Sequence, residues 1–283
     1  MEIKYYMSLL KSLAYSVRIK GGFMGRFFNN IKKYYKYAIY SAKAELKSEV
    51  ADSYLNWLWW IIEPVCFMLI YTFVFGYIFK KNEPYFASFI FVGLTCWEFF
   101  NRMINGSVKL IISNRDLVTK VYLPKYILLL SKSFTYLFKL GISLVITIVL
   151  MLFQHVPFSW HMILLVPIIV VLYIFSFGLG LLLMHFGVTF NDLANLTNIG
   201  LKMVFYLSGV FYNISTRLKG TLGHVLLYAN PIAFLMNEGR KVMIYNTLPN
   251  FAFLGLWLLV GVLLCLLGVH VIHKNENSYA KVI

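Results

Sequence analysis

The sequence predicts an all-α polytopic membrane protein with six transmembrane helices, an N-terminal amphipathic interface helix and two short re-entrant helices between spans five and six. Two observations carry this prediction. The 283 residues are 60% hydrophobic with a mean hydropathy of +0.73, far above what one soluble core needs. The apolar residues also form continuous runs of about 20, enough for a helix to cross about 30 Å of hydrocarbon, and do not alternate as in a β-barrel.

Residues 1–56 form the first predicted unit, a basic cytoplasmic segment that is too short to fold alone. Within it, IKKYYKYAIYSAKAELKSEV places apolar residues three and four apart with lysines between them: Ile31, Tyr35, Ile39, Ala42 and Leu46. This spacing predicts an amphipathic helix lying in the membrane interface. A solvated basic tail is the alternative. For residues 1–28 the two interpretations are equally favoured.

Residues 57–283 form the second unit, the six-span transmembrane domain. The predicted spans are residues 57–79, 86–103, 128–153, 162–188, 199–212 and 251–273. The second is polar for a span and the fifth is short. Apart from His270 with His273, which are interpreted as interfacial residues at the end of the last span, the three cysteines and six histidines show no spacing typical of a metal site, so no metal is expected.

The distribution of charge predicts the orientation. The net charge of +15 would suggest nucleic acid for a soluble protein, but here the basic residues gather before the first span and between the second and third. The loop QHVPFSWH after the third span contains no lysine or arginine. By the positive-inside rule, the N-terminus and residues 114–125 are cytoplasmic, and an even span count returns the C-terminus to the cytoplasm.

Residues 213–250 contain two apolar runs that are too short to span, separated at Asn230-Pro231. We expect them to form two re-entrant helices in the outer leaflet, where irregular backbone must be covered by protein or line a water-filled cavity. Glu238 is expected to pair with Arg240 or Lys241 and to fix an outer gate together with Asn230 and Pro231. A solvated loop end is the alternative.

The segment NRDLVTKVYLPK, residues 114–125, is charge-rich and lies between apolar spans. It predicts a short helix parallel to the membrane that ends before a proline. Its inward-facing residues are predicted to be Leu117, Val118 and Val121, and its partner-facing residues Arg115, Asp116 and Lys120. This pattern is typical of a coupling element, and an ordinary solvated loop is the alternative.

This segment resembles the cytoplasmic loop of the permease subunits of ABC-2 type exporters for polysaccharides and polyol phosphates, a group that handles O-antigens, capsules and teichoic acids. The resemblance extends from about residue 42 to the C-terminus. The matching loop positions are Asn114, Leu117, Val118, Lys120, Val121, Leu123 and Pro124. Further matches, in order, are Ser53, Trp59 and Pro64, then Gly93, Trp97, Phe99 and Phe100, then Asp192, Ser208, Asn230, Pro231 and Arg240. Asn56 and Asn191 depart from the family pattern, which has glycine and arginine there.

The resemblance implies the permease subunit of an ATP-driven exporter of a lipid-linked cell-surface polysaccharide, in a bacterial inner or plasma membrane. The sequence has no G-x-x-x-x-G-K-[ST] loop, so ATP and Mg are expected on a separate P-loop ATPase subunit, with neither a catalytic residue nor a cofactor on this chain. A homodimer in a 2+2 complex is expected. Coupling to the ATPase is assigned to Asn114, Arg115, Asp116, Lys120, Asn191 and Asp192.

Aromatic residues make up 18% of the chain and indicate a glycan path, because ring faces suit the C–H faces of sugars. The expected path residues are Tyr71, Phe75, Phe99 and Phe100, with Lys43, Lys47 and Arg102 receiving a lipid diphosphate at headgroup level. Ordinary packing is the alternative for each aromatic. Glu63 and Glu98 are intramembrane acids with either a functional or a structural role.

Two other function classes are weighed. A related exporter of a drug, peptide or ordinary lipid shares the same architecture. A membrane-embedded transferase of lipid-linked sugars would need clustered acids to hold a divalent cation, and the chain has only 11 acids with no D-x-D motif. The sequence leaves open which polymer and lipid carrier are moved, the Gram type, and whether the ATPase has an extra carbohydrate-binding domain.

Overall fold

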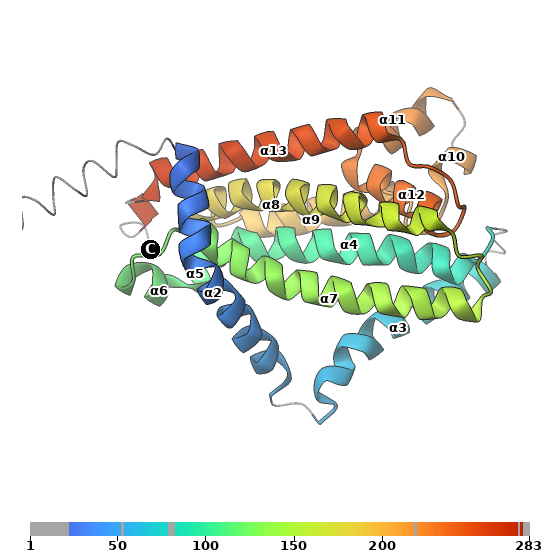
Figure 1. The fold of residues 1–283 in the computed structure, drawn as a ribbon, viewed down its shortest axis with the longest axis horizontal. Helices are drawn as coiled ribbons and strands as arrows, with labels where there is room; N and C mark the ends of the chain where they lie inside the picture. Colours follow the sequence, from blue (N-terminus) through green and yellow to red (C-terminus); the bar gives the residue numbers. More distant parts are fainter. Residues whose placement is uncertain (1–22, 52–53, 79–82, 218–219, 277, 280–283) are drawn as a thin grey trace, which may run out of the picture.

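The computed structural model describes residues 23–51, 54–78, 83–217, 220–276 and 278–279, and Figure 1 shows its fold. Within these ranges every regular element is a helix, which confirms the all-α prediction. Residues 1–22 of the predicted N-terminal segment and Phe79, the expected end of the first span, lie outside the described residues.

A bundle of long helices forms the body of the protein: α4 (Phe86–Val108), α7 (Tyr126–Phe153), α8 (Leu165–Thr189) and α13 (Phe251–Lys274), with α9 (Leu193–Leu207) against α4. The core is apolar, with Phe89, Ile127 and Leu172 completely buried. α4 is the central helix because α7, α8, α9 and α12 (Pro231–Met243) all contact it.

Glycines set the close contact between α8 and α13. A Cβ on Gly178 would lie 2.7 Å from the backbone nitrogen of Cys265, and one on Gly268 would lie 2.6 Å from Cβ of Leu181. Such small residues let the backbones of membrane helices approach closely, so that van der Waals packing holds them together.

In the part of the chain that the structure describes, four helical segments are long and apolar enough to cross a membrane: Trp59–Tyr77, Tyr126–Phe153, Trp160–Thr189 and Phe251–Lys274. They coincide with the predicted first, third, fourth and sixth spans. The predicted second span is the 23-residue helix α4, which falls short of these criteria. Of its 23 residues 17 are buried, so protein covers most of its surface. The predicted fifth span is the 15-residue helix α9, which begins at Leu193 instead of residue 199.

The N-terminal helix α2 (Phe23–Val50) crosses the long helices steeply and packs against α7. The helix was predicted, and part of its predicted apolar face packs on the protein. Ala42 is buried and Ile31 packs against the core, whereas Tyr35 and Ile39 of the same face are 42% and 40% exposed. The rotation of the helix therefore leaves Tyr35 and Ile39 outside the protein.

Polar contacts with α7 explain this rotation. Glu45 pairs with Lys132, and Glu49 pairs with Lys139 at 2.6 Å. Between α2 and α7, the Ser131 hydroxyl also donates to the Ala38 carbonyl at 3.1 Å. These contacts turn the glutamates of α2 toward α7, which leaves Tyr35 and Ile39 outside.

The two ends of the bundle carry different short helices. At one end lie α5 (Leu110–Ser113) and α6 (Arg115–Lys120), beside α2 and the last described residues (Figure 1). At the other end lie α10 (Ile214–Arg217), α11 (Thr221–Ala229) and α12. The break between α11 and α12 falls at Asn230-Pro231, as predicted.

The first apolar segment lies along one side of the bundle. A 3-10 turn at Asn56–Leu58 leads into α3 (Trp59–Tyr71), and a π-helical stretch, Thr72–Ile78, continues it. A second 3-10 turn, Trp160–Leu164, leads into α8.

Candidate functional site

The predicted coupling segment folds as the separate helix α6, which presents its charges outward. Arg115, Asp116 and Lys120 are all exposed, and Lys120 pairs with Asp116 at 3.4 Å along the helix. Val118 is buried and anchors the helix, whereas Val121, which was predicted to face inward, is 52% exposed. The reason is that the helix ends at Lys120 and Val121 is already extended.

Side-chain contacts fix the start and the end of this segment. Asn114 donates from Nδ2 to the Leu110 carbonyl at 2.8 Å, which joins α5 to α6. Beyond α6, Lys125 is buried and donates from Nζ to the Leu123 carbonyl at 3.2 Å. This burial lowers the pKa of Lys125, although the negative charge of Glu276 opposes the shift. Nothing in the neighbouring residues indicates that this lysine faces inward.

Asn191 and Asp192 form the exposed turn between α8 and α9. The end of α8 lies against the end of α4, because a Cβ on Gly187 would overlap the carbonyl oxygen of Val108. The turn and α6 are therefore at the same end of the bundle. The six predicted coupling residues thus share one end, and among them only Asn114 is half-buried.

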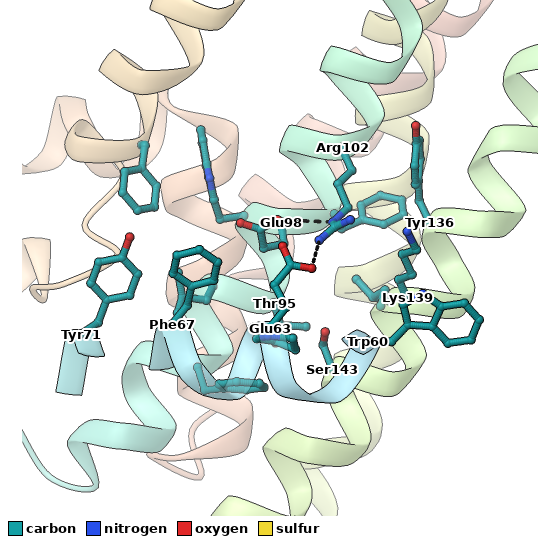
Figure 2. A pocket seen from close by; sticks show the side chains of 17 residues that line it. Trp60, Glu63, Phe67, Tyr71, Thr95, Glu98, Arg102, Tyr136, Lys139 and Ser143 are labelled. Carbon is teal, nitrogen blue, oxygen red and sulfur yellow. Dashed lines mark ion pairs between the residues drawn. The ribbon is translucent and has the colours of Figure 1, made fainter. Parts of the chain in front are cut away.

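A cavity of about 260 Å³ lies between α3, α4 and α7, with Phe205 of α9 at its edge. Figure 2 shows that Arg102 lies between two carboxylates. Its guanidinium is 3.6 Å from Glu63 Oε2 and 3.4 Å from Glu98 Oε2. Glu98 and Arg102 are one turn apart on α4, whereas Glu63 comes from α3 just before Pro64.

These three charged side chains are only half-buried. Arg102 is 32% exposed, Glu63 50% and Glu98 43%. Their open sides face the cavity, so the ion pairs are partly solvated and weak. Such groups can exchange one hydrogen-bond partner for another at low cost. Carboxylates that accept hydrogen bonds beside aromatic rings suit polyhydroxylated ligands.

Aromatic side chains form much of the remaining wall: Trp60, Phe67, Tyr71, Trp97 and Phe99. Two of the predicted path residues, Tyr71 and Phe99, thus line the cavity. Phe75 does not line it and stacks on Phe211 at a centroid distance of 4.4 Å. Phe100 is buried in the core beside Phe175, which is the packing alternative.

The three predicted phosphate-binding cations are not brought together. Lys43 and Lys47 lie on the exposed side of α2, whereas Arg102 lies in the cavity with its two glutamates. The cavity instead contains Lys139, which was not singled out. Lys132 and Lys139 fall seven residues apart inside an apolar predicted span, which is the signal that could have identified them.

A second cluster lies at the opposite end from α6 and is organised by Asn230. Its side-chain oxygen accepts from the backbone N–H of Ile232 and Ala233, which caps α12, and Pro231 occupies the first helical position. Its Nδ2 donates to the Ser208 hydroxyl at 2.9 Å. The Asn-Pro pair therefore joins the start of α12 to the end of α9.

Glu238 is completely buried and pairs with Lys241 at 2.8 Å. It also accepts from the Asn250 N–H at 2.7 Å, which fixes the start of α13. The predicted pairing with a neighbouring cation is confirmed, with Lys241 as the partner, and a solvated loop end is not what the structure shows.

Arg240 has different partners from those predicted. Its buried guanidinium donates to three backbone carbonyls: Phe89 at 3.1 Å, Gly209 at 2.8 Å and Val210 at 2.8 Å. It also lies over the Phe89 ring, 3.6 Å from the centroid. These contacts join α12 to α4 and to the turn after α9, which sequence reasoning did not find.

Apolar membrane helices, an exposed charged helix at one end and a half-open polar cavity between the helices define a membrane transport protein. The chain belongs to the ABC-2 type transporter family, whose model matches residues 39–244. It is 29% identical over 259 residues to the O-antigen export system permease protein RfbA of Myxococcus xanthus, covering 91% of this chain and 99% of that protein.

Two further relatives are also transport proteins by name. An O-antigen export system permease protein RfbA of Klebsiella pneumoniae is 24% identical over 84% of this chain and 92% of its own length. The polysialic acid transport protein KpsM of Escherichia coli is 25% identical over 70% of this chain and 78% of its own length.

Proposed function

We propose that this chain is the permease subunit of an ATP-driven ABC exporter that moves a lipid-linked cell-surface polysaccharide out of the bacterial cytoplasm across the inner or plasma membrane. The observation that carries the proposal is α6, a charged helix held outward on an apolar molecule of this family. Relatives named for O-antigen export and polysialic acid transport support a polysaccharide as the substrate.

The proposed topology has six spans, with α4 and α9 as the second and fifth. A span surrounded by other helices needs fewer apolar residues than one facing lipid, and 17 of the 23 residues of α4 are buried. α11 and α12 are re-entrant from the outer side, where Asn230 and Arg240 form hydrogen bonds with backbone groups outside the helical ladders. Both termini, α6 and the Asn191-Asp192 turn are cytoplasmic, as the positive-inside rule indicates.

The proposed energy source is a separate P-loop ATPase subunit that binds ATP and Mg. α6 and the Asn191-Asp192 turn form its docking surface, since they are exposed at one end of the bundle. The assembly is two permease copies with two ATPase copies. An exposed apolar stripe on α9, which includes Leu196, Ile199 and Met203, supports a second copy of the chain beside it.

The proposed substrate path uses the cavity around Arg102. Its aromatic rings and carboxylates offer stacking and hydrogen bonding to sugars. An exporter of another lipid or of a drug is the second candidate, and a mixed apolar and charged cavity is compatible with it. Comparing export of a lipid-linked glycan with export of the same lipid without sugars distinguishes the two.

The test swaps the charges of α6. Asp116→Lys combined with Lys120→Glu keeps an ion pair along the helix. It reverses the order of the negative and positive charges on the surface that a partner subunit would contact. We expect ATPase activity coupled to the permease to fall about tenfold. The free energy of unfolding should change by less than about 0.5 kcal/mol, because both side chains are exposed.

Lys274→Glu, an exposed charge reversal at the end of α13, is the matched control. The measurements are copurification of a P-loop ATPase with the tagged chain and its hydrolysis rate. If the swapped variant and the control behave alike, α6 is not the coupling helix. If no P-loop ATPase copurifies under several mild conditions, the exporter proposal itself fails.

A further inference from the structure

A second pocket, of about 650 Å³, lies between α2, the α4–α6 segment and the start of α7. It shares no lining residue with the cavity around Arg102. Its apolar floor includes Gly106, Leu110 and Leu128, and its walls carry charged, hydroxyl and amide side chains. The Ser131 hydroxyl, which donates to the Ala38 carbonyl, joins the α2 wall to α7, and the Asn114 contact with Leu110 fixes the other wall.

The charges in this pocket leave one cation available. Glu45 is the only acid among the described residues that line it and is neutralised by Lys132. Lys109 is exposed, and in the described part of the chain it forms no ion pair with an acid. Hydroxyl donors line the same pocket: Tyr37, Ser41, Ser48 and Ser113. One lysine among hydroxyl and amide donors is a chemistry that suits phosphate oxygens.

The pocket lies around the first two turns of α7, one of the four segments long and apolar enough to cross a membrane. Lys109 directly follows the end of α4, and Lys132 lies six residues, about 9 Å, along α7 from its first residue. Lipid phosphate groups are found at this depth, and a lipid tail could leave the pocket along its apolar floor.

We propose that this pocket binds the phosphate group of a lipid in the leaflet on the α6 side, with Lys109 as its main cation. That the lipid is the diphosphate carrier of the exported polymer rests on the proposed function. An anionic phospholipid of the bilayer is the other source of the same chemistry. Because Asn114 lines the pocket and joins α5 to α6, an occupant contacts the base of the coupling helix.

The test uses the full-length chain, with whatever subunits copurify, in phosphatidylcholine nanodiscs. Native mass spectrometry measures binding of a polyprenyl diphosphate, phosphatidylglycerol and soluble pyrophosphate. Lys109→Gln should weaken binding of the polyprenyl diphosphate about tenfold, the loss expected for one charge-assisted hydrogen bond. Lys36→Gln removes an exposed charge of α2 outside the pocket and should leave binding unchanged.

A second pair of variants tests the role of Glu45. Glu45→Gln removes the only acid and frees Lys132, so phosphate binding should tighten several-fold. Glu49→Gln breaks the equivalent ion pair between α2 and α7 outside the pocket, and it should not change binding.

Preference for the polyprenyl diphosphate over phosphatidylglycerol identifies the polymer carrier as the ligand, and equal affinity identifies a bilayer phospholipid. The site is overturned if Lys109→Gln has no effect or weakens binding no more than Lys36→Gln. Binding requires neither ATP nor export. If the variants do not change lipid binding but export is intact, the binding site is wrong and the proposed function is unaffected. If lipid binding behaves as expected but no ATPase copurifies, the result counts only against the proposed function.

Discussion

Arg240 allows the contribution of one buried side chain to be predicted quantitatively. In Arg240→Met, the carbonyls of Gly209 and Val210 lose their donors, whereas the Phe89 carbonyl also belongs to the hydrogen-bond ladder of α4. Each unsatisfied buried carbonyl costs about 1–3 kcal/mol, so the two together cost about 2–6 kcal/mol. Removing a buried charge offsets part of this cost. We expect a net loss of about 3 kcal/mol in the free energy of unfolding.

Gly93 tests the same contact from α4. A Cβ at this position would overlap Nη2 of Arg240, so Gly93→Ala should displace the guanidinium and cost about 1–3 kcal/mol. In the Arg240→Met background the flexible thioether can move aside, and alanine is the better helix former. The double variant should therefore be more stable than the sum of the two single changes predicts, by at least about 1 kcal/mol.

The assay is equilibrium unfolding by dodecyl sulfate in mixed micelles, followed by circular dichroism and tryptophan fluorescence. Gly141→Ala on α7 is the matched control, since nothing lies within 4 Å of the added methyl group. If the two effects add within about 0.5 kcal/mol, Gly93 and Arg240 do not interact and the placement of the guanidinium is wrong.

Two further predictions use the same unfolding assay. Gly187→Ala should cost about 2–4 kcal/mol because the Val108 backbone cannot move aside, whereas Gly200→Ala, which meets nothing within 4 Å, should cost less than about 0.5 kcal/mol; equal effects would contradict the close contact of α8 with α4. Arg102→Gln leaves two carboxylates without their cation and should cost about 1–2 kcal/mol, most of which a second change, Glu98→Gln, should restore. If the second change restores nothing, repulsion between the acids is not the cause.

Local patterns in the sequence predicted the local parts of this structure. Continuous apolar runs gave the four spanning segments, the Asn230-Pro231 pair gave the break between α11 and α12, and the alternation of charge in residues 114–125 gave α6. Each of these features is decided within a few residues, through helix period, capping or proline geometry.

The contacts that the sequence did not reveal join residues far apart in the chain. Arg240 meets the Phe89 carbonyl across 151 positions, and hydropathy contains no information on which carbonyl a buried arginine will find. The packing of α2 on α7 was not predicted for the same reason, since the ion pair between Glu45 and Lys132 joins residues 87 positions apart. Arg102 was predicted to bind a lipid phosphate because Glu63 and Glu98 were treated as isolated acids and not as its ion-pair partners.

α4 carries residues of all three regions. Its first turns contact Arg240 through Phe89 and Gly93, its middle carries Glu98 and Arg102, and its last residue leads through α5 into α6. α9 runs from the Asn191-Asp192 turn past Phe205 at the cavity to the Ser208 contact with Asn230. Communication between distant sites requires an element whose position both sites can bias, and α4 and α9 both reach all three regions. The close contact of Gly187 with the Val108 backbone leaves no space for the end of α4 to move toward α8.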